Sequence, residues 1–155
     1  MAITYTNDIK TVLDALELTL NTEFKPIPIV IEPELDIAKL AKKNEYIRVW
    51  CTGDERLSRI AGGVYRIYNI DIVYYLNKSY YRQEKILDED ISPRIERIER
   101  LLENNITYGD GATWYNIAVN TINYNFDLTA ELDIEGVENI VAVTINIDIS
   151  RGSFF

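Results

Sequence analysis

The carboxylates and tyrosines are the side chains with the most evident capacity for chemistry in this chain of 155 residues. Asp88, Glu89 and Asp90 form its densest acidic run, and carboxylate oxygens are the ligands that Ca²⁺ and Mg²⁺ prefer. Successive residues converge on one ion only within a specific loop, and no calcium-loop spacing surrounds this run. We therefore expect a solvated acidic loop and no metal site here.

The composition excludes the common catalytic machinery. The chain has no histidine, which removes Ser-His-Asp and Cys-His sites, histidine metal sites and the most frequent general base. Cys51 is its single cysteine, so an internal disulfide and a cysteine-cluster metal site are both excluded. The glycines at 62–63 and 109–111 lack the spacing of a phosphate-binding loop. We expect no catalytic residue and no cofactor.

The charge balance restricts the partners. Lys and Arg number 16 against 25 Asp and Glu, a net charge of −9. Nucleic acid binding depends on basic groups that displace counterions, so we expect no direct binding of DNA or RNA. The alternative that stays open is DNA as a non-specific passenger along an acidic surface. No apolar run approaches the ~18 residues that span a membrane, and the first residues lack the features of a signal peptide. We expect synthesis in a reducing cytoplasm and no membrane partner.

Two helices should cover a sheet. Residues 8–21 place apolar side chains on one stripe, and a second helix should begin at Ser92-Pro93, with serine as its cap and proline in its first turn. The two stripes are Ile9, Val12, Leu13, Leu16 and Leu20, and Ile95, Ile98, Leu101 and Leu102. A short helix over 33–43 is also predicted, whereas the pattern assigns no structure to 78–91.

Strands are predicted between the helices. Residues 29–31 form a short edge strand between prolines, 45–52 form a second strand, and 64–77 form a long third one. Cys51 lies on the apolar face of the second strand and should be a small core residue. The intervening residues 53–63 are charged and end in glycine, so we expect a mobile loop.

The clearest strand pattern lies at 120–150. Apolar and polar residues alternate from 122 to 134 and again from 141 to 149, which is typical of strands with one buried and one wet face. A five-residue turn around Gly136 should join the two arms into a long β-hairpin. The chain is thus predicted to be a single α+β domain over 1–155, with a mostly antiparallel sheet, a long C-terminal hairpin and two main helices packed on one face.

The order of these elements resembles that of phage tail terminator proteins. The segment 5–16, with sequence YTNDIKTVLDAL, is similar to their N-terminal helix, and 47–56, IRVWCTGDER, is similar to their strand that runs into a polar Thr-Gly loop. The strand at 65–76 followed by the helix at 91–102, and the closing hairpin, are similar too. The resemblance covers nearly the whole chain as a pattern, without a diagnostic short motif. This chain departs from it by a longer segment at 78–91 and an extended C-terminal tail.

The resemblance implies a structural virion protein without catalytic activity. Such proteins form homohexameric rings that stop tube polymerisation and present a surface to the head-side connector. The implied partners are other copies of the chain, a tail tube protein and a head-side connector or neck protein. The implied location is the virion tail or neck.

We expect the contacts at the 53–63 loop, at the hairpin with its turn, and at the C-terminal tail. The interface candidates are Gly53, Asp54, Glu55, Arg56 and Arg59 in the loop, Asp127, Glu131, Asp133, Glu135 and Gly136 in the hairpin, and Arg151, Phe154 and Phe155 in the tail. The terminal phenylalanines could equally fold back on the core.

Three alternatives stay open. The first is another neck, connector or adaptor protein of the virion. The second is a small-ligand-binding or enzymatic α+β domain that uses Asp, Tyr and Arg, which a deep apolar pocket with convergent polar groups would favour. The third is a monomeric scaffold module that docks through tyrosine-rich strands.

Overall fold

The computed structural model describes residues 8–25, 27–31, 44–60, 63–80, 83–104, 114–126 and 139–154. The helix predicted over 33–43 and the turn at Gly136 lie outside the described residues. So do five interface candidates besides Gly136, namely Asp127, Glu131, Asp133, Glu135 and Phe155.

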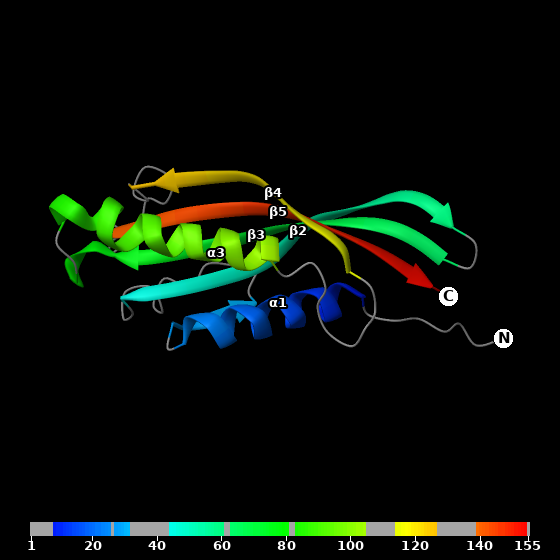
Figure 1. Cartoon of the computed structure of the whole chain (residues 1–155), viewed down its shortest axis with the longest axis horizontal. Helices are drawn as coiled ribbons and strands as arrows, with labels where there is room; N and C mark the ends of the chain where they lie inside the picture. The colour runs from blue at the N-terminus through cyan, green and yellow to red at the C-terminus, as the bar shows by residue number, and fades with distance from the viewer. Residues whose placement is uncertain are drawn as a thin grey trace.

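The described strands form one five-stranded sheet in the order β1-β2-β3-β5-β4 (Figure 1). The strands are β1 (Ile29–Ile31), β2 (Glu45–Ile60), β3 (Gly63–Asn77), β4 (Trp114–Asn125) and β5 (Ile140–Phe154). Only β1 pairs in parallel, and it lies at the edge of the sheet as its flanking prolines predict. The other three pairings are antiparallel, which confirms the predicted α+β class.

Two helices, α1 (Asp8–Phe24) and α3 (Ser92–Asn104), pack against the same face of this sheet. Val12, Leu16 and Leu20 of α1 are fully buried, and Ile98 and Leu102 of α3 are buried with them in one core. That core includes the inward residues of β2, β3 and β5, so the predicted stripes and their packing are confirmed.

The start of α3 differs from the prediction. The acidic run lies in a six-residue π-helical segment, Ile86–Ile91, and not in a loop. Ser92 has helical backbone angles, and its N–H donates to the Leu87 carbonyl. An N-cap residue has non-helical backbone angles, so Ser92 is not the predicted N-cap of α3, because the chain before it is already helical.

The pairing of β4 with β5 confirms the antiparallel arms of the hairpin but not its turn. Asn125 lies opposite Ala142, whereas a five-residue turn around Gly136 would place Leu132 there. The Val141–Ile149 face of β5 is buried while β5 pairs with β3 as well as β4.

A second, smaller core covers part of the opposite face. Tyr46, Val73, Tyr75, Ile140 and Ala142 are all buried there. Partly buried Val30 and Trp50 pack against them, and the guanidinium carbon of Arg48 lies 3.8 Å from the centroid of the Trp50 ring. This end of the sheet is therefore buried on both faces, whereas the sequence predicted that one face would be exposed to water.

Candidate interaction surfaces

Three strands extend beyond the helices and form an arm. Figure 1 shows β2, β3 and β5 continuing past the ends of α1 and α3 towards the C-terminus. We define the arm as residues 53–60, 63–69 and 148–154. The predicted loop at 53–63 is wrong, because residues 53–60 continue β2 in register with β3. The predicted tail is likewise a strand, because Arg151 and Phe154 pair with β3.

The arm gathers predicted site residues from distant parts of the sequence. Gly53, Asp54 and Glu55 are exposed on β2, and Arg56 and Arg59 follow them on the same strand. Gly63 lies opposite Phe154 at the distal end. The fold therefore joins two of the three predicted contact regions into a single element.

An arginine row crosses the arm. Arg56 lies opposite Arg66, and Arg66 lies opposite Arg151, so the three residues occupy one register row of β2, β3 and β5. Arg66 contacts the exposed Asp54 at 3.3 Å. The sequence pattern missed Arg66 because it lies within a predicted strand, and only the pairing register reveals it.

Amide and carboxylate side chains form a polar network where the arm joins the sheet body. Asn69 donates to Asn146 at 3.1 Å and to Asp148 at 2.8 Å, and Asn146 donates to Asp71 at 2.7 Å. Thr52 donates to Asn69, and Asn120 donates to Asn146 at 3.0 Å. Hydrogen bonds thus connect side chains from four strands on the face opposite the helices.

Cys51 lies near the root of the arm. Its thiol is half-buried, packs against the main core as predicted and donates to the Gly53 carbonyl at 3.2 Å. Burial raises the pKa of this thiol, the Gly53 contact lowers it, and nearby Asp54 raises it further. The net increase disfavours a reactive thiolate.

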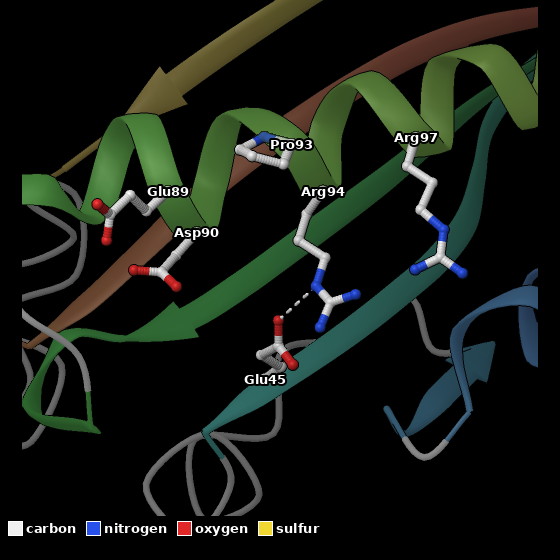
Figure 2. Close-up of a pocket in the computed structure, with 6 residues that line it drawn as sticks. All are labelled: Glu45, Glu89, Asp90, Pro93, Arg94 and Arg97. Carbon is white, nitrogen blue, oxygen red and sulfur yellow. Dashed lines mark hydrogen bonds and ion pairs between the residues drawn. The ribbon is translucent and has the colours of Figure 1, made fainter.

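A polar cavity of about 250 Å³ lies beside the π-helical segment, at the other end of the sheet. Its lining residues are Glu45, Glu89, Asp90, Pro93, Arg94 and Arg97. Figure 2 shows Asp90 and Arg94 projecting from the helix to the side on which Glu45 of β2 lies. Arg94 Nε donates to Glu45 Oε1 at 3.0 Å, and the buried Tyr74 hydroxyl donates to the same oxygen.

The two arginines of the cavity are engaged in ion pairs. Arg94 pairs with Glu45, while Arg97 pairs with Glu23 of α1 at 2.7 Å and also donates to the Glu23 carbonyl at 3.0 Å. Glu89 reaches Lys85 at 3.5 Å. Burial, followed by the charges of Glu89 and Glu45, raises the pKa of Asp90, whereas Arg94 lowers it. The surroundings of Asp90 therefore disfavour its charged form.

An apolar pair is exposed at the end of β4. Tyr124 and Phe126 were predicted on the dry face of the hairpin, yet they are 44% and 42% exposed. Their rings stack with centroids 6.3 Å apart. Tyr124 lies opposite the buried Val143, so it is on the predicted face of the sheet. Its exposure follows from its place on the edge strand β4.

The described residues contain no group of three or more His, Cys, Asp or Glu side chains arranged to hold a metal ion. Within the same part of the chain, no helix has both the length and the apolarity to cross a membrane.

Comparison with known proteins gives a structural match only. No family model matches the sequence, and no curated protein matches it. A chain from the virion of a native gene transfer agent particle aligns over 96% of this chain and 100% of its own length, with a TM-score of 0.60 and 6% identity. Another solved chain aligns over 98% of this chain and 99% of its own length, with a TM-score of 0.50 and 12% identity.

A sheath/tube terminator of an extracellular contractile injection system, solved in the extended state, aligns over 99% of this chain at 13% identity and a TM-score of 0.49. The present chain spans 59% of that protein. The gene transfer agent chain, in contrast, is matched over its whole length and with a higher TM-score. The chain therefore has the fold of a protein from the gene transfer agent virion.

Proposed function

We propose that this chain is a structural virion protein that forms a homo-oligomeric ring, hexameric by its resemblance to tail terminators. The ring caps the tail tube and joins it to the head-side connector, and it performs no catalysis. The observation that carries this proposal is the full-length match to a chain of the gene transfer agent virion. The implied partners are the tail tube protein and the connector, with DNA only passing through the lumen.

The shape of the chain supports assembly. β2, β3 and β5 are 16, 15 and 15 residues long, about three times a typical strand of ~5–6 residues. Beyond β1, the outer edge of β2 has no partner strand among the described residues, and neither does the outer edge of β4. Open edges are templates for pairing with another chain.

The cavity near Glu45 gives little support to a small-ligand-binding function. The cavity near Glu45 is smaller than the ~300–1,000 Å³ of ordinary ligand sites, which are mostly apolar. Five of its six lining residues are charged. We therefore treat the cavity as a surface for a protein partner.

Native mass spectrometry of the purified chain tests the proposal. We expect a discrete oligomer, six times the 17.9 kDa chain mass if the resemblance holds to the copy number, and a ring with an open lumen in electron micrographs. A chain that stays monomeric at high concentration, and also fails to form a ring with its tube or connector partner, would refute the ring.

A further inference from the structure

Charge is distributed unevenly along the long axis of the molecule. The arm carries four of the nine arginines, Arg56, Arg59, Arg66 and Arg151, against three carboxylates, although the whole chain is at −9. The π-helical segment and the residues just before it, 83–91, carry four carboxylates against one lysine. Figure 1 places this green segment and the arm at opposite ends of the sheet.

The arginine row places like charges in register on three neighbouring strands. Like charges directly opposite each other on neighbouring strands repel, and residues in register lie on the same face of a sheet. Arg56, Arg66 and Arg151 form such a row. Asp54 contacts Arg66, but both side chains are exposed, so this surface pair contributes little to stability. A partner that supplies carboxylates would relieve the repulsion.

The cavity at the other end has the complementary imbalance. Its arginines are already paired with Glu45 and Glu23, and the pKa of Asp90 is raised because burial and two nearby carboxylates oppose its charge. A guanidinium placed beside Asp90 and Glu89 would neutralise that excess. The cavity opens between β2 and the helix, where an incoming side chain can enter.

We propose that the arm of one copy docks against the acidic end of the next copy, with the arginine row facing Glu89 and Asp90 at the cavity. The contact joins two different surfaces at opposite ends of the chain, so it is heterologous and closes into a ring if the rotation between copies permits. This inference rests on the proposed ring and names the surfaces that hold neighbouring copies together.

Charge reversal at each surface tests the contact. The arm variant carries Arg56→Glu and Arg66→Glu, and the cavity variant carries Glu89→Lys and Asp90→Lys. Each alone should weaken self-association at least about tenfold, because like charges then meet across the interface. Mixed in equal amounts, the two variants should assemble again, since each junction in an alternating ring then pairs opposite charges. Sedimentation velocity and native mass spectrometry report both results.

Matched controls separate this contact from a general effect of charge. Lys10→Glu with Lys25→Glu changes the net charge as the arm variant does, and Glu99→Lys with Glu103→Lys changes it as the cavity variant does. Both control pairs lie outside the arm and outside the cavity lining. They should assemble like the wild type. If circular dichroism shows that a reversal variant does not fold, a neutral variant replaces it. The neutral variants are Arg56→Gln with Arg66→Gln for the arm and Glu89→Gln with Asp90→Asn for the cavity, and each should also weaken self-association.

The outcomes distinguish this inference from the proposed function. Reversal variants that assemble like the wild type, or folded variants whose mixture stays dissociated, would overturn the docking contact and leave the ring intact. A wild type that forms no ring under any condition would overturn both. If the arm variant instead assembles normally but loses binding to an anionic partner such as DNA, the arm serves that partner and the contact between copies is wrong.

Discussion

At the scale of single residues, stability depends on whether a side chain lies beneath the helices or outside them. Leu16 and Leu18 share helix α1, but Leu16 is fully buried in the main core and Leu18 is 69% exposed. Leu16→Ala removes apolar contacts and leaves a cavity, so we expect a loss of about 2–5 kcal/mol in the free energy of unfolding. Leu18→Ala should stay within about 0.5 kcal/mol of the wild type. Urea unfolding of both variants measures the difference. Equal losses of unfolding free energy would contradict the burial of Leu16 in the core.

The hydroxyl of Tyr74 should stabilise the protein through its bond to Glu45. Tyr74 is 1% exposed, and Glu45 is among the few buried acidic residues of the described chain. Tyr74→Phe leaves the carboxylate with one donor fewer, so we expect a loss of about 1–3 kcal/mol in the free energy of unfolding. Tyr124→Phe is the matched control, because Tyr124 is 44% exposed. Thermal or urea denaturation that finds the two variants equally stable would contradict the bond.

Asp90 should make stability depend on pH. Its pKa is raised in the folded chain above the ordinary value of 3.8, first by burial and then by Glu89 and Glu45, with Arg94 acting in the opposite direction. Between the two values the folded state holds more protons than the unfolded state, so the free energy of unfolding falls as pH rises through that window. Asp90→Asn removes this loss.

We therefore expect Asp90→Asn to match the wild type below about pH 3.8 and to be the more stable of the two above the window. Urea unfolding of the monomeric chain at a series of pH values measures the difference. Asp88→Asn, which changes an exposed carboxylate that does not line the cavity, controls for net charge. A difference between Asp90→Asn and the wild type that is the same at every pH would show that the carboxyl group does not titrate in the way its surroundings predict.

At the scale of elements, local patterns predicted what lies beneath a helix and failed beyond it. The stripe of α1 and the β5 alternation both follow from burial on one face, and both were predicted. Residues 53–60 show no alternation of apolar and polar side chains, because Gly53, Asp54 and Glu55 are all exposed to solvent. Their charged, glycine-containing sequence therefore indicated a loop. Their strand conformation comes from pairing with β3, a partner that no local pattern reveals.

Register was the other feature that the sequence did not disclose. β-Bulges after Cys51 and Arg56 in β2 and after Trp114 and Val119 in β4 each shift the alternation by one residue. The arginine row depends on the shift after Cys51, which sets Arg56 opposite Arg66. The sequence therefore predicted individual residues of the arm as interface candidates. It did not predict that they lie together in one element, and it did not predict the cavity.

The arm should be the least protected part of the sheet in the monomer. Apart from Tyr68 and Ile149, which lie in the main core, its residues extend past the helices. Ile47, Val49, Ile72 and Tyr74 of β2 and β3 lie in the main core. Local opening requires less free energy where few apolar contacts must break. We expect amides at 53–60 and 63–67 to exchange with deuterium at least about tenfold faster than amides at 47–49 and 72–74. Mass spectrometry of peptic fragments measures both, and uniform exchange along β2 would contradict an exposed arm.

At the scale of the whole molecule, the sign of the salt dependence distinguishes an ionic contact between copies from an apolar one. The arm and the acidic segment carry opposite charge excesses at the two ends of the sheet. The Debye length falls from about 10 Å at 0.1 M salt to about 3 Å at 1 M, so exposed charges attract less. An assembly held by Tyr124, Phe126 and similar apolar contacts would not weaken in this way, because salt does not screen apolar burial.

We therefore expect sodium chloride to dissociate the oligomer, with the monomer fraction rising between about 0.05 M and 0.5 M as screening increases. Sedimentation velocity at fixed protein concentration measures that fraction. The urea midpoint of the monomeric chain over the same range is the control, since the main core is apolar and should hold its stability when surface pairs are screened. An oligomer that persists or strengthens with salt, while the monomer stays folded, would show that apolar contacts or strand pairing dominate the interface and that the arginine row is secondary.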